Sequence, residues 1–193
     1  RRAKELLRLF LEFSPDICFH LEIHPALLSE ELKKELRQLP AGLLHLEAGI
    51  QSLREPVLEK SRRIGKLSDA LEGLKFLCSL SNMETHADLI AGLPLYRLDE
   101  IFEDIYTLAG YRAGEIQLES LKLLPGTEMR HRADELGIRY SPLPPYEVLQ
   151  TGEISVGELQ TARRLSRLLD AFYNTPAWQE LTRELILNDR RFL

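Results

Sequence analysis

The stretch LLHLEAGIQS, residues 43–52, decides the fold, because apolar and polar side chains alternate along it. It carries His45, Glu47 and Gln51, which lie two and four positions apart. Successive side chains of a strand point to opposite faces of its sheet. The stretch therefore predicts a strand with one apolar face and one polar face.

Three other apolar runs carry a similar alternation, in FHLEIHP (19–25), THADLIAG (85–92) and IQLESL (116–121). Segments with apolar residues at helical spacing stand before, between and after these runs, at 2–13, 29–39, 55–62, 68–81, 99–109 and 127–137. Strands that alternate with helices at intervals of about 30 residues are typical of βαβ units and a parallel sheet. Helix N-caps are expected at Ser29, Ser68, Asp99 and Thr127.

The one-sided strands favour a partial barrel over a doubly wound sheet. A parallel sheet covered by helices on both faces has almost continuously apolar strands, and these strands are polar on one face. Unpaired carboxylates and imidazoles are costly to bury. We therefore predict an α/β fold, a partial (β/α) barrel whose lumen holds water or a polar ligand. The acidic residues lie towards the carboxyl ends of the strands, where such folds place their sites.

The last quarter of the chain has a different pattern. SPLPPYE at 141–147 has the composition of a linker. Ser155 and Glu158 form a capping box, and Thr175-Pro176 begins a further helix. We therefore expect a barrel part at residues 1–137 and a helical appendage at residues 138–193.

Composition restricts the class of protein. The 193 residues carry a net charge of −5, which does not indicate binding to nucleic acid. No apolar run approaches the roughly 18 residues of a membrane span. The two cysteines, Cys18 and Cys78, have no metal-ligand spacing and are expected to be buried thiols in a reduced, cytoplasmic chain. The chain begins at Arg1 rather than at a methionine, which favours a fragment.

Four motifs resemble, in order, those of the second half of a radical S-adenosylmethionine (radical SAM) enzyme core. They are HLEIHP, LEAGIQS followed by VLEKSRR, DLIAGLP, and SLKLLPGTEM, and the resemblance spans residues 17–128. It implies that the chain supplies strands three to six of a six-unit (β/α) core. The first motif and the helical tail are also similar to the branch that carries an upstream cobalamin-binding domain.

The resemblance also implies roles for particular residues in binding S-adenosylmethionine. Glu22 and Gln51 would contact its methionyl and ribose parts, and Arg63, twelve residues after Gln51, would pair with its carboxylate. Asp88 would contact the ribose or the substrate side, and Ile90 would pack near the adenine. Arg62 would replace Arg63 if the helix register differed.

The chain departs from the family where the iron–sulfur cluster is bound. Members carry a C-x-x-x-C-x-x-C motif whose thiolates hold a [4Fe–4S] cluster, and neither Cys18 nor Cys78 supplies it. The glycine-rich motif of the second strand is also absent. A fragment that begins after strand two explains both, so its partner would be the missing N-terminal half of its own chain. We expect such a fragment to be inactive alone, and its sequence identifies no substrate.

Two other functions remain open from the residues. A metal-dependent barrel hydrolase would bind a divalent metal through side chains of the polar face, which are His20, Glu22, His45, Glu47, His86 and Asp88. A non-catalytic module would bind a partner through the region of Trp178 and an apolar stripe, which is Leu159, Ala162, Leu165, Leu169 and Phe172. Such a stripe more commonly packs against the rest of its own protein.

Overall fold

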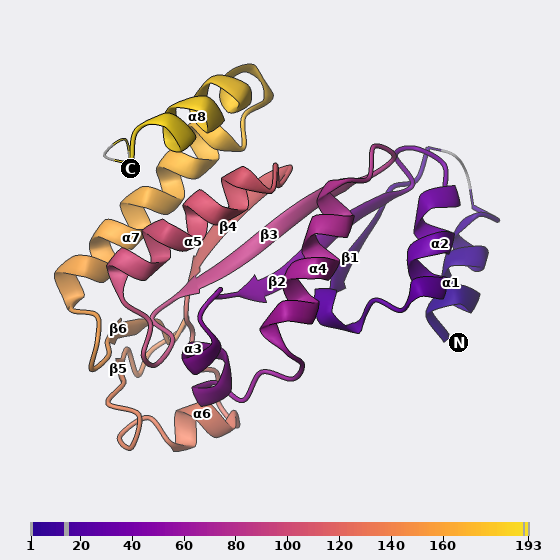
Figure 1. The fold of residues 1–193 in the computed structure, drawn as a ribbon. Helices are drawn as coiled ribbons and strands as arrows, with labels where there is room; N and C mark the ends of the chain where they lie inside the picture. Colours follow the sequence, from indigo (N-terminus) through magenta and orange to yellow (C-terminus); the bar gives the residue numbers. More distant parts are fainter. Residues whose placement is uncertain (1, 14–15, 191, 193) are drawn as a thin grey trace.

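The four predicted strands form one parallel sheet in the computed structural model, which describes residues 2–13, 16–190 and 192 (Figure 1). The strands are β1 (Phe19–Ile23), β2 (Leu44–Gln51), β3 (Glu84–Ala91) and β4 (Glu115–Ser120). They lie in the sheet in the order of the chain, and all three pairings are parallel. A doubly wound sheet would reverse its strand order part-way. The expected α/β fold, a partial (β/α) barrel, is confirmed.

Helices cover the apolar face of the sheet. The connections contain α2 (Glu30–Gln38), α3 (Glu55–Lys60), α4 (Leu67–Cys78) and α5 (Leu98–Gly110), and Figure 1 shows α4 and α5 in front of the strands. The apolar side chains that the strands bury on this side are Leu44, Leu46, Ala48, Ile50, Ala87, Leu89, Ile116 and Leu118. Burying them provides the main driving force for forming the sheet.

Two local contacts fix the chain around β1. The ring of Phe10, in α1 (Arg2–Phe10), stacks on the ring of Phe19 with the centroids 3.9 Å apart. After β1, the 3-10 helix Pro25–Leu27 packs against α4, where a Cβ at Gly73 would collide with the carbonyl of Pro25. Glycine at position 73 therefore permits this close approach.

The polar face of the sheet has the arrangement that the alternation predicts. His20 pairs in register with His45, Glu22 with Glu47, and Glu47 with His86. On β3, His86 and Asp88 are only 6% and 8% exposed, although both belong to the polar set. Ionisable groups are therefore buried in the middle of the sheet, beside the cavity described below.

The chain beyond residue 137 contains strands as well as helices. The expected linker, 141–147, is the loop between two short antiparallel strands, β5 (Arg139–Tyr140) and β6 (Val148–Gln150). The backbone of Val148 donates a hydrogen bond to Leu121, and that of Leu123 donates one to Tyr146, at 2.8 and 2.9 Å. This segment therefore forms a separate two-stranded sheet that is hydrogen-bonded to the chain just beyond β4.

Two helices complete the C-terminal part. They are α7 (Val156–Leu168), which runs into a π-helical turn at Leu169–Tyr173, and α8 (Pro176–Asn188). The stripe predicted on α7 packs inward at Leu159, Ala162, Leu165 and Leu169. Its last member, Phe172, is 46% exposed. Four of the five residues of the stripe therefore pack against the rest of the protein, as such stripes commonly do.

One side chain from this part covers the outer edge of β4. The amide oxygen of Asn174 accepts a hydrogen bond from the backbone N–H of Ile116 at 2.9 Å, and its amide nitrogen donates one to the Ile116 carbonyl at 3.1 Å. A strand edge exposes such groups to pairing with other chains. Asn174 satisfies them in place of a neighbouring strand.

Several expected helix starts differ from the structure. Ser29 caps α2, and Ser155 with Glu158 forms the predicted capping box of α7. By contrast, α4 and α5 begin earlier than expected, directly after the extended residues Lys66 and Arg97. Ser68 and Asp99 therefore lie inside the first turn, and the prediction that they are N-caps was wrong. Thr127 is the N-cap residue of α6 (Glu128–His131), but its hydroxyl donates to Leu124 instead of accepting from the helix.

None of the helices in the described part of the chain is both long and apolar enough to cross a bilayer.

Candidate functional site

Four of the five predicted site residues line one polar cavity of about 260 Å³. They are Glu22, Gln51, Arg63 and Asp88, and the same cavity is lined by Ile23, His24, Glu47 and Gly49. The residues come from β1, β2, β3 and the loop after α3, so the fold brings together positions up to 66 residues apart. The fifth residue, Ile90, lines an adjoining cavity of about 340 Å³ that shares Gln51 and Arg63 with the first.

Gln51 ends β2 in an unusual backbone conformation. Its φ is +69°, in the left-handed region that residues other than glycine seldom adopt. The pairing of β2 with β3 shifts register between Gly49 and Gln51, which marks a β-bulge. Bulges and left-handed residues re-aim side chains and are concentrated at functional sites. Here they accompany an amide side chain on the cavity wall.

Arg63 reaches the cavity from the loop that follows α3. One of its terminal nitrogens donates a hydrogen bond to the backbone carbonyl of Gly49. Its Nε is buried and has no hydrogen-bond partner among the described residues. Burial lowers the pKa of Arg63, although a guanidinium remains charged at neutral pH. The cavity therefore holds a fixed positive charge with unused donor capacity.

The neighbouring arginine does not share this position. The guanidinium of Arg62 forms an ion pair with Glu128, at the start of α6, and the side chain is 63% exposed. Arg62 lines only the adjoining cavity. Of the two arginines, Arg63 is the one placed beside Gln51, Glu22 and Asp88.

Three carboxyl groups form the acidic part of the cavity wall, in contrast to the positive charge of Arg63. His20 lies 3.0 Å from Glu47, and its hydrogen bond lowers the pKa of that carboxyl. Asp88 is buried, and its Oδ1 has no partner among the described residues. Burial, followed by the charge of Glu47, raises the pKa of Asp88 to about 7. Glu22 is the third carboxyl group and also raises the pKa of Asp88.

His24 and Gly49 were not predicted as site residues. The Nδ1 of His24 accepts a hydrogen bond from the N–H of Ala26, so its Nε2 is the atom that donates to the carbonyl of Ile64, at 2.7 Å. Burial and the charge of Arg63 lower the pKa of His24, consistent with this neutral form. His24 thus ties the end of β1 to the residue after Arg63, a long-range contact that no local sequence pattern reveals.

The histidines of the polar face pair with each other and with carboxyl groups. The Nε2 atoms of His45 and His86 are 2.6 Å apart, and His86 lies 2.8 Å from Glu115. Among residues 2–13, 16–190 and 192, no group of three or more His, Cys, Asp or Glu side chains is arranged to hold a metal ion. The arrangement therefore gives no support to a metal-dependent hydrolase.

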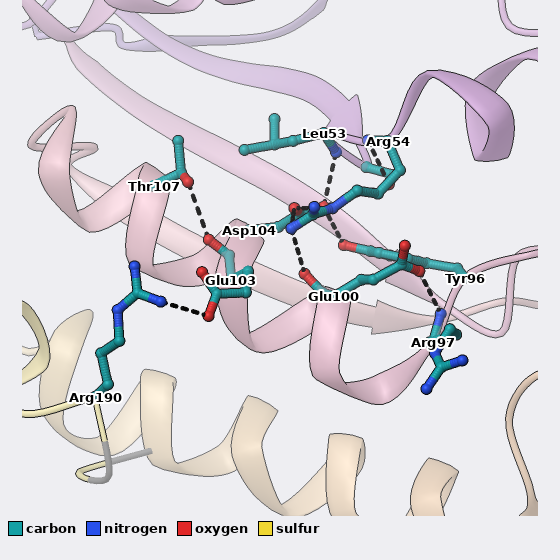
Figure 2. A network of polar contacts seen from close by, with 10 residues as sticks. Leu53, Arg54, Tyr96, Arg97, Glu100, Glu103, Asp104, Thr107 and Arg190 are labelled. Atoms are coloured by element: carbon teal, nitrogen blue, oxygen red, sulfur yellow. Dashed lines mark hydrogen bonds and ion pairs between the residues drawn. The ribbon is translucent and has the colours of Figure 1, made fainter.

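A buried polar network holds the backbone immediately after Gln51 (Figure 2). The carboxylate of Asp104, which is 1% exposed, accepts hydrogen bonds from the N–H of Leu53 and the hydroxyl of Tyr96, at 2.8 and 2.6 Å. It also accepts one from Nε of Arg54 at 2.8 Å and one from Ser52 at 3.3 Å. Because Asp104 belongs to α5, this network anchors the β2–α3 turn to a helix of the core.

Exposed apolar residues collect on the C-terminal helices. A cavity of about 470 Å³ there is lined mainly by large apolar side chains, which are Leu168, Leu169, Phe172, Trp178, Leu181, Leu185, Ile186 and Phe192. Trp178 is 51% exposed. Of the surface predicted for a partner, the region of Trp178 and Phe172 is thus exposed, whereas the other four residues of the stripe are buried.

Comparison with solved structures identifies the architecture. The chain superposes on TsrM, a radical S-adenosylmethionine methyltransferase from Kitasatospora setae, with a TM-score of 0.57 and 16% identity, covering 75% of this chain and 30% of TsrM. It also superposes on the radical SAM enzyme HemN, coproporphyrinogen III oxidase from Escherichia coli, with a TM-score of 0.53 and 16% identity, covering 72% of this chain and 37% of HemN. The chain has the radical SAM fold. The resemblance inferred from the four motifs is thus confirmed at the level of the fold.

Sequence comparison gives a similar result. The heme chaperone HemW of Haemophilus influenzae is 26% identical over 127 residues, which cover 65% of this chain and 32% of HemW. The chain therefore spans about a third of the length of the relatives it matches. Residues 134–191 match a family described as "Protein of unknown function (DUF4080)". That segment contains the β5–β6 hairpin, α7 and α8.

The site suits S-adenosylmethionine but not an iron–sulfur cluster. Arg63 and Asp88 bring a cationic donor and a carboxyl acceptor to the same cavity wall, and each has a buried polar atom without a partner among the described residues. A Cβ at Gly49 would lie 3.3 Å from both the Arg63 and the Gln51 side-chain nitrogens, so glycine leaves room for both. The two cysteines are separate, Cys18 being exposed, contrary to expectation, and Cys78 half-buried. They do not form a cluster site.

Proposed function

We propose that this chain is the S-adenosylmethionine-binding part of a radical SAM enzyme core. The observation that carries the proposal is the convergence of Glu22, Gln51, Arg63 and Asp88 on one cavity. These residues were selected from the sequence through their positions in separate motifs. Their meeting at the carboxyl end of a parallel sheet is what a shared ligand would require.

The charges of the cavity match the two ends of a methionyl group. Arg63 would pair with the ligand carboxylate, since it lines the cavity and an arginine can bind a carboxylate through two hydrogen bonds. Glu22 and Gln51 would hold the methionyl amino group and the ribose. Asp88 would lie against the ribose or the substrate side, and Ile90 would pack near the adenine in the adjoining cavity.

In the whole protein, we propose that S-adenosylmethionine is cleaved to a 5′-deoxyadenosyl radical with an electron from a [4Fe–4S] cluster. The ligands of that cluster would come from the missing N-terminal half of the core, the expected partner of this chain. TsrM has been solved with both cobalamin and a [4Fe–4S] cluster, and a cobalamin-binding domain upstream is part of the proposal. The chain alone would be inactive, and its expected location is cytoplasmic.

Binding of S-adenosylmethionine to the 193-residue chain tests the proposal. We expect Arg63→Ala to weaken binding, measured by calorimetry, by about tenfold or more, because a charge-assisted pair is worth about 1.5–3 kcal/mol. Arg112→Ala is the matched control, since it removes an exposed arginine that pairs with Glu180 and lines neither cavity. Equal affinities of the two variants would contradict the assignment.

Iron analysis tests the proposal that the cluster is bound by the N-terminal half of the core and not by this chain. After anaerobic reconstitution with iron and sulfide, we expect the isolated chain to retain no stoichiometric cluster. A longer protein that contains the C-x-x-x-C-x-x-C segment should retain one and release 5′-deoxyadenosine from S-adenosylmethionine. A stoichiometric cluster on the isolated chain would contradict the proposal that the cluster ligands lie outside it.

A further inference from the structure

Asp88 is a buried carboxyl group in the wall of the cavity. Its side chain lies in the middle of β3 and is 8% exposed. One of its oxygens has no hydrogen-bond partner among the described residues, although the residue lines the cavity. A buried and unpaired carboxylate is unfavourable unless it is protonated or bound to a cation. The group therefore needs a proton or a ligand.

The surroundings of Asp88 decide which carboxyl group holds the proton. Glu47, on β2, is within hydrogen-bonding reach of Asp88 and is itself held ionised by His20 on β1. The other ionisable groups around Asp88 are Glu22 on β1, Glu119 on β4, His86 on β3 and Arg63 on the cavity wall. Burial has the largest effect on Asp88 and the repulsion of the surrounding carboxylates adds to it, so the pKa of Asp88 is raised to about 7.

We propose that the ligand-free cavity holds one proton between Asp88 and Glu47, and that the cationic end of the ligand displaces this proton. The inference rests on the proposed function, because it takes the ligand to be one with a positive charge beside a carboxylate. Arg63 would fix the carboxylate, and the positive charge would then lie towards the acidic wall. The exchange is a proton transfer: the O–H bond of the Asp88 carboxyl breaks, the proton binds to water or buffer, and the ligand cation pairs with the carboxylate that remains.

The sign of the pH dependence follows from this exchange. Only the deprotonated pair binds the cation well, so affinity increases as the pH rises through about 7 and levels off above about 8. For a group that titrates near pH 7 in the free protein, the dissociation constant should fall about tenfold from pH 6 to pH 8. The analogue S-adenosylhomocysteine has the same amino and carboxylate groups without the sulfonium charge, so it should show a similar change.

The experiment measures proton release directly. Calorimetric titration of the chain with S-adenosylmethionine at pH 6, in two buffers of different ionisation enthalpy, should give release of about one proton. Asp88→Asn, which keeps the shape of the side chain, should bind with almost no release and a flattened pH dependence. Asp99→Asn is the matched control at an exposed carboxylate on α5 and should behave as the wild type.

A carbon-13 NMR titration of the ligand-free chain separates this inference from the proposed function. The Asp88 carboxyl should titrate near pH 7 without ligand and at least about two pH units lower with S-adenosylmethionine. Titration as an ordinary surface carboxyl, or binding without proton release, would overturn the inference and leave the proposed function standing. Absence of any binding, with Asp88 titrating near pH 7, would instead refute the proposed function and this inference with it.

Discussion

The guanidinium of Arg63 donates a hydrogen bond to the backbone carbonyl of Gly49, and this contact exists because position 49 has no side chain. The two residues are fourteen positions apart and belong to different elements. The contact turns the arginine from the loop after α3 toward the end of β2. It places the positive charge of the cavity next to Gln51.

Gly49→Ala should therefore weaken ligand binding more than it weakens folding. The added Cβ would lie 3.3 Å from the side-chain nitrogens of Arg63 and Gln51, so both must shift. We expect about a tenfold loss of affinity for S-adenosylmethionine by calorimetry, because small displacements of charge-assisted hydrogen bonds are costly.

Gly157→Ala is the control for a glycine replacement. Gly157 is an exposed residue in α7, and a Cβ there would meet nothing within 4 Å. This variant should be more stable by about 0.5–1 kcal/mol and should bind as the wild type does. If both alanine variants bound equally well, the spatial role of Gly49 would be wrong.

Asp104→Asn should destabilise the chain and disturb the site as well. The carboxylate of Asp104 pairs with Arg54 and accepts bonds from Leu53 and Tyr96 in a buried position. Removing its charge should cost about 2–4 kcal/mol of unfolding free energy in denaturant titrations. Because the network holds the turn after Gln51, ligand affinity should also fall.

Glu103→Gln is a control on the same helix, and Figure 2 shows both carboxylates. Glu103 is 44% exposed and pairs with Arg190 at 3.0 Å near the end of the chain. Its replacement should change the unfolding free energy by less than about 1 kcal/mol, as for other exposed ion pairs. A similar loss for both variants would contradict the importance assigned to Asp104.

Asn174→Ala should expose the edge of β4. The substitution removes both hydrogen bonds to the backbone of Ile116, so buried polar groups lose their partners. We expect a loss of about 1–3 kcal/mol in unfolding free energy and faster hydrogen exchange at the Ile116 amide. The same change at Asn188, an exposed residue at the end of α8, should leave that amide protected.

The unfolding free energy of the ligand-free chain should depend on Asp88 in a predictable direction. Its pKa is raised in the folded state, to about 7, so the folded chain binds more protons than the unfolded chain between about pH 4 and 7. Stability contributed by the protonated form is therefore lost as the pH rises through this window. Relative to wild type, Asp88→Asn should become progressively more stable up to about pH 7, and a constant difference across pH 4–8 would contradict the raised pKa.

The local sequence pattern predicts the four strands, their two faces and three of the cavity residues. The period-two alternation is local, because it depends only on which way successive side chains point. It therefore predicted that Glu22, Gln51 and Asp88 lie on the polar face of a parallel sheet. Arg63 followed from the family resemblance, and its position in the cavity agrees with that expectation.

How these groups interact depends on contacts between segments that are far apart in the chain. The pairing of Glu47 with Asp88, the bond from Arg63 to Gly49, the anchoring by Asp104 and the edge cover by Asn174 all join distant segments. Even the helix starts at Leu67 and Leu98 depended on where the preceding residue leaves the extended conformation, so nearby Ser68 and Asp99 were misleading signals. Side-chain alternation is set by local geometry, whereas burial, pKa and hydrogen bonding depend on which segments the fold brings into contact.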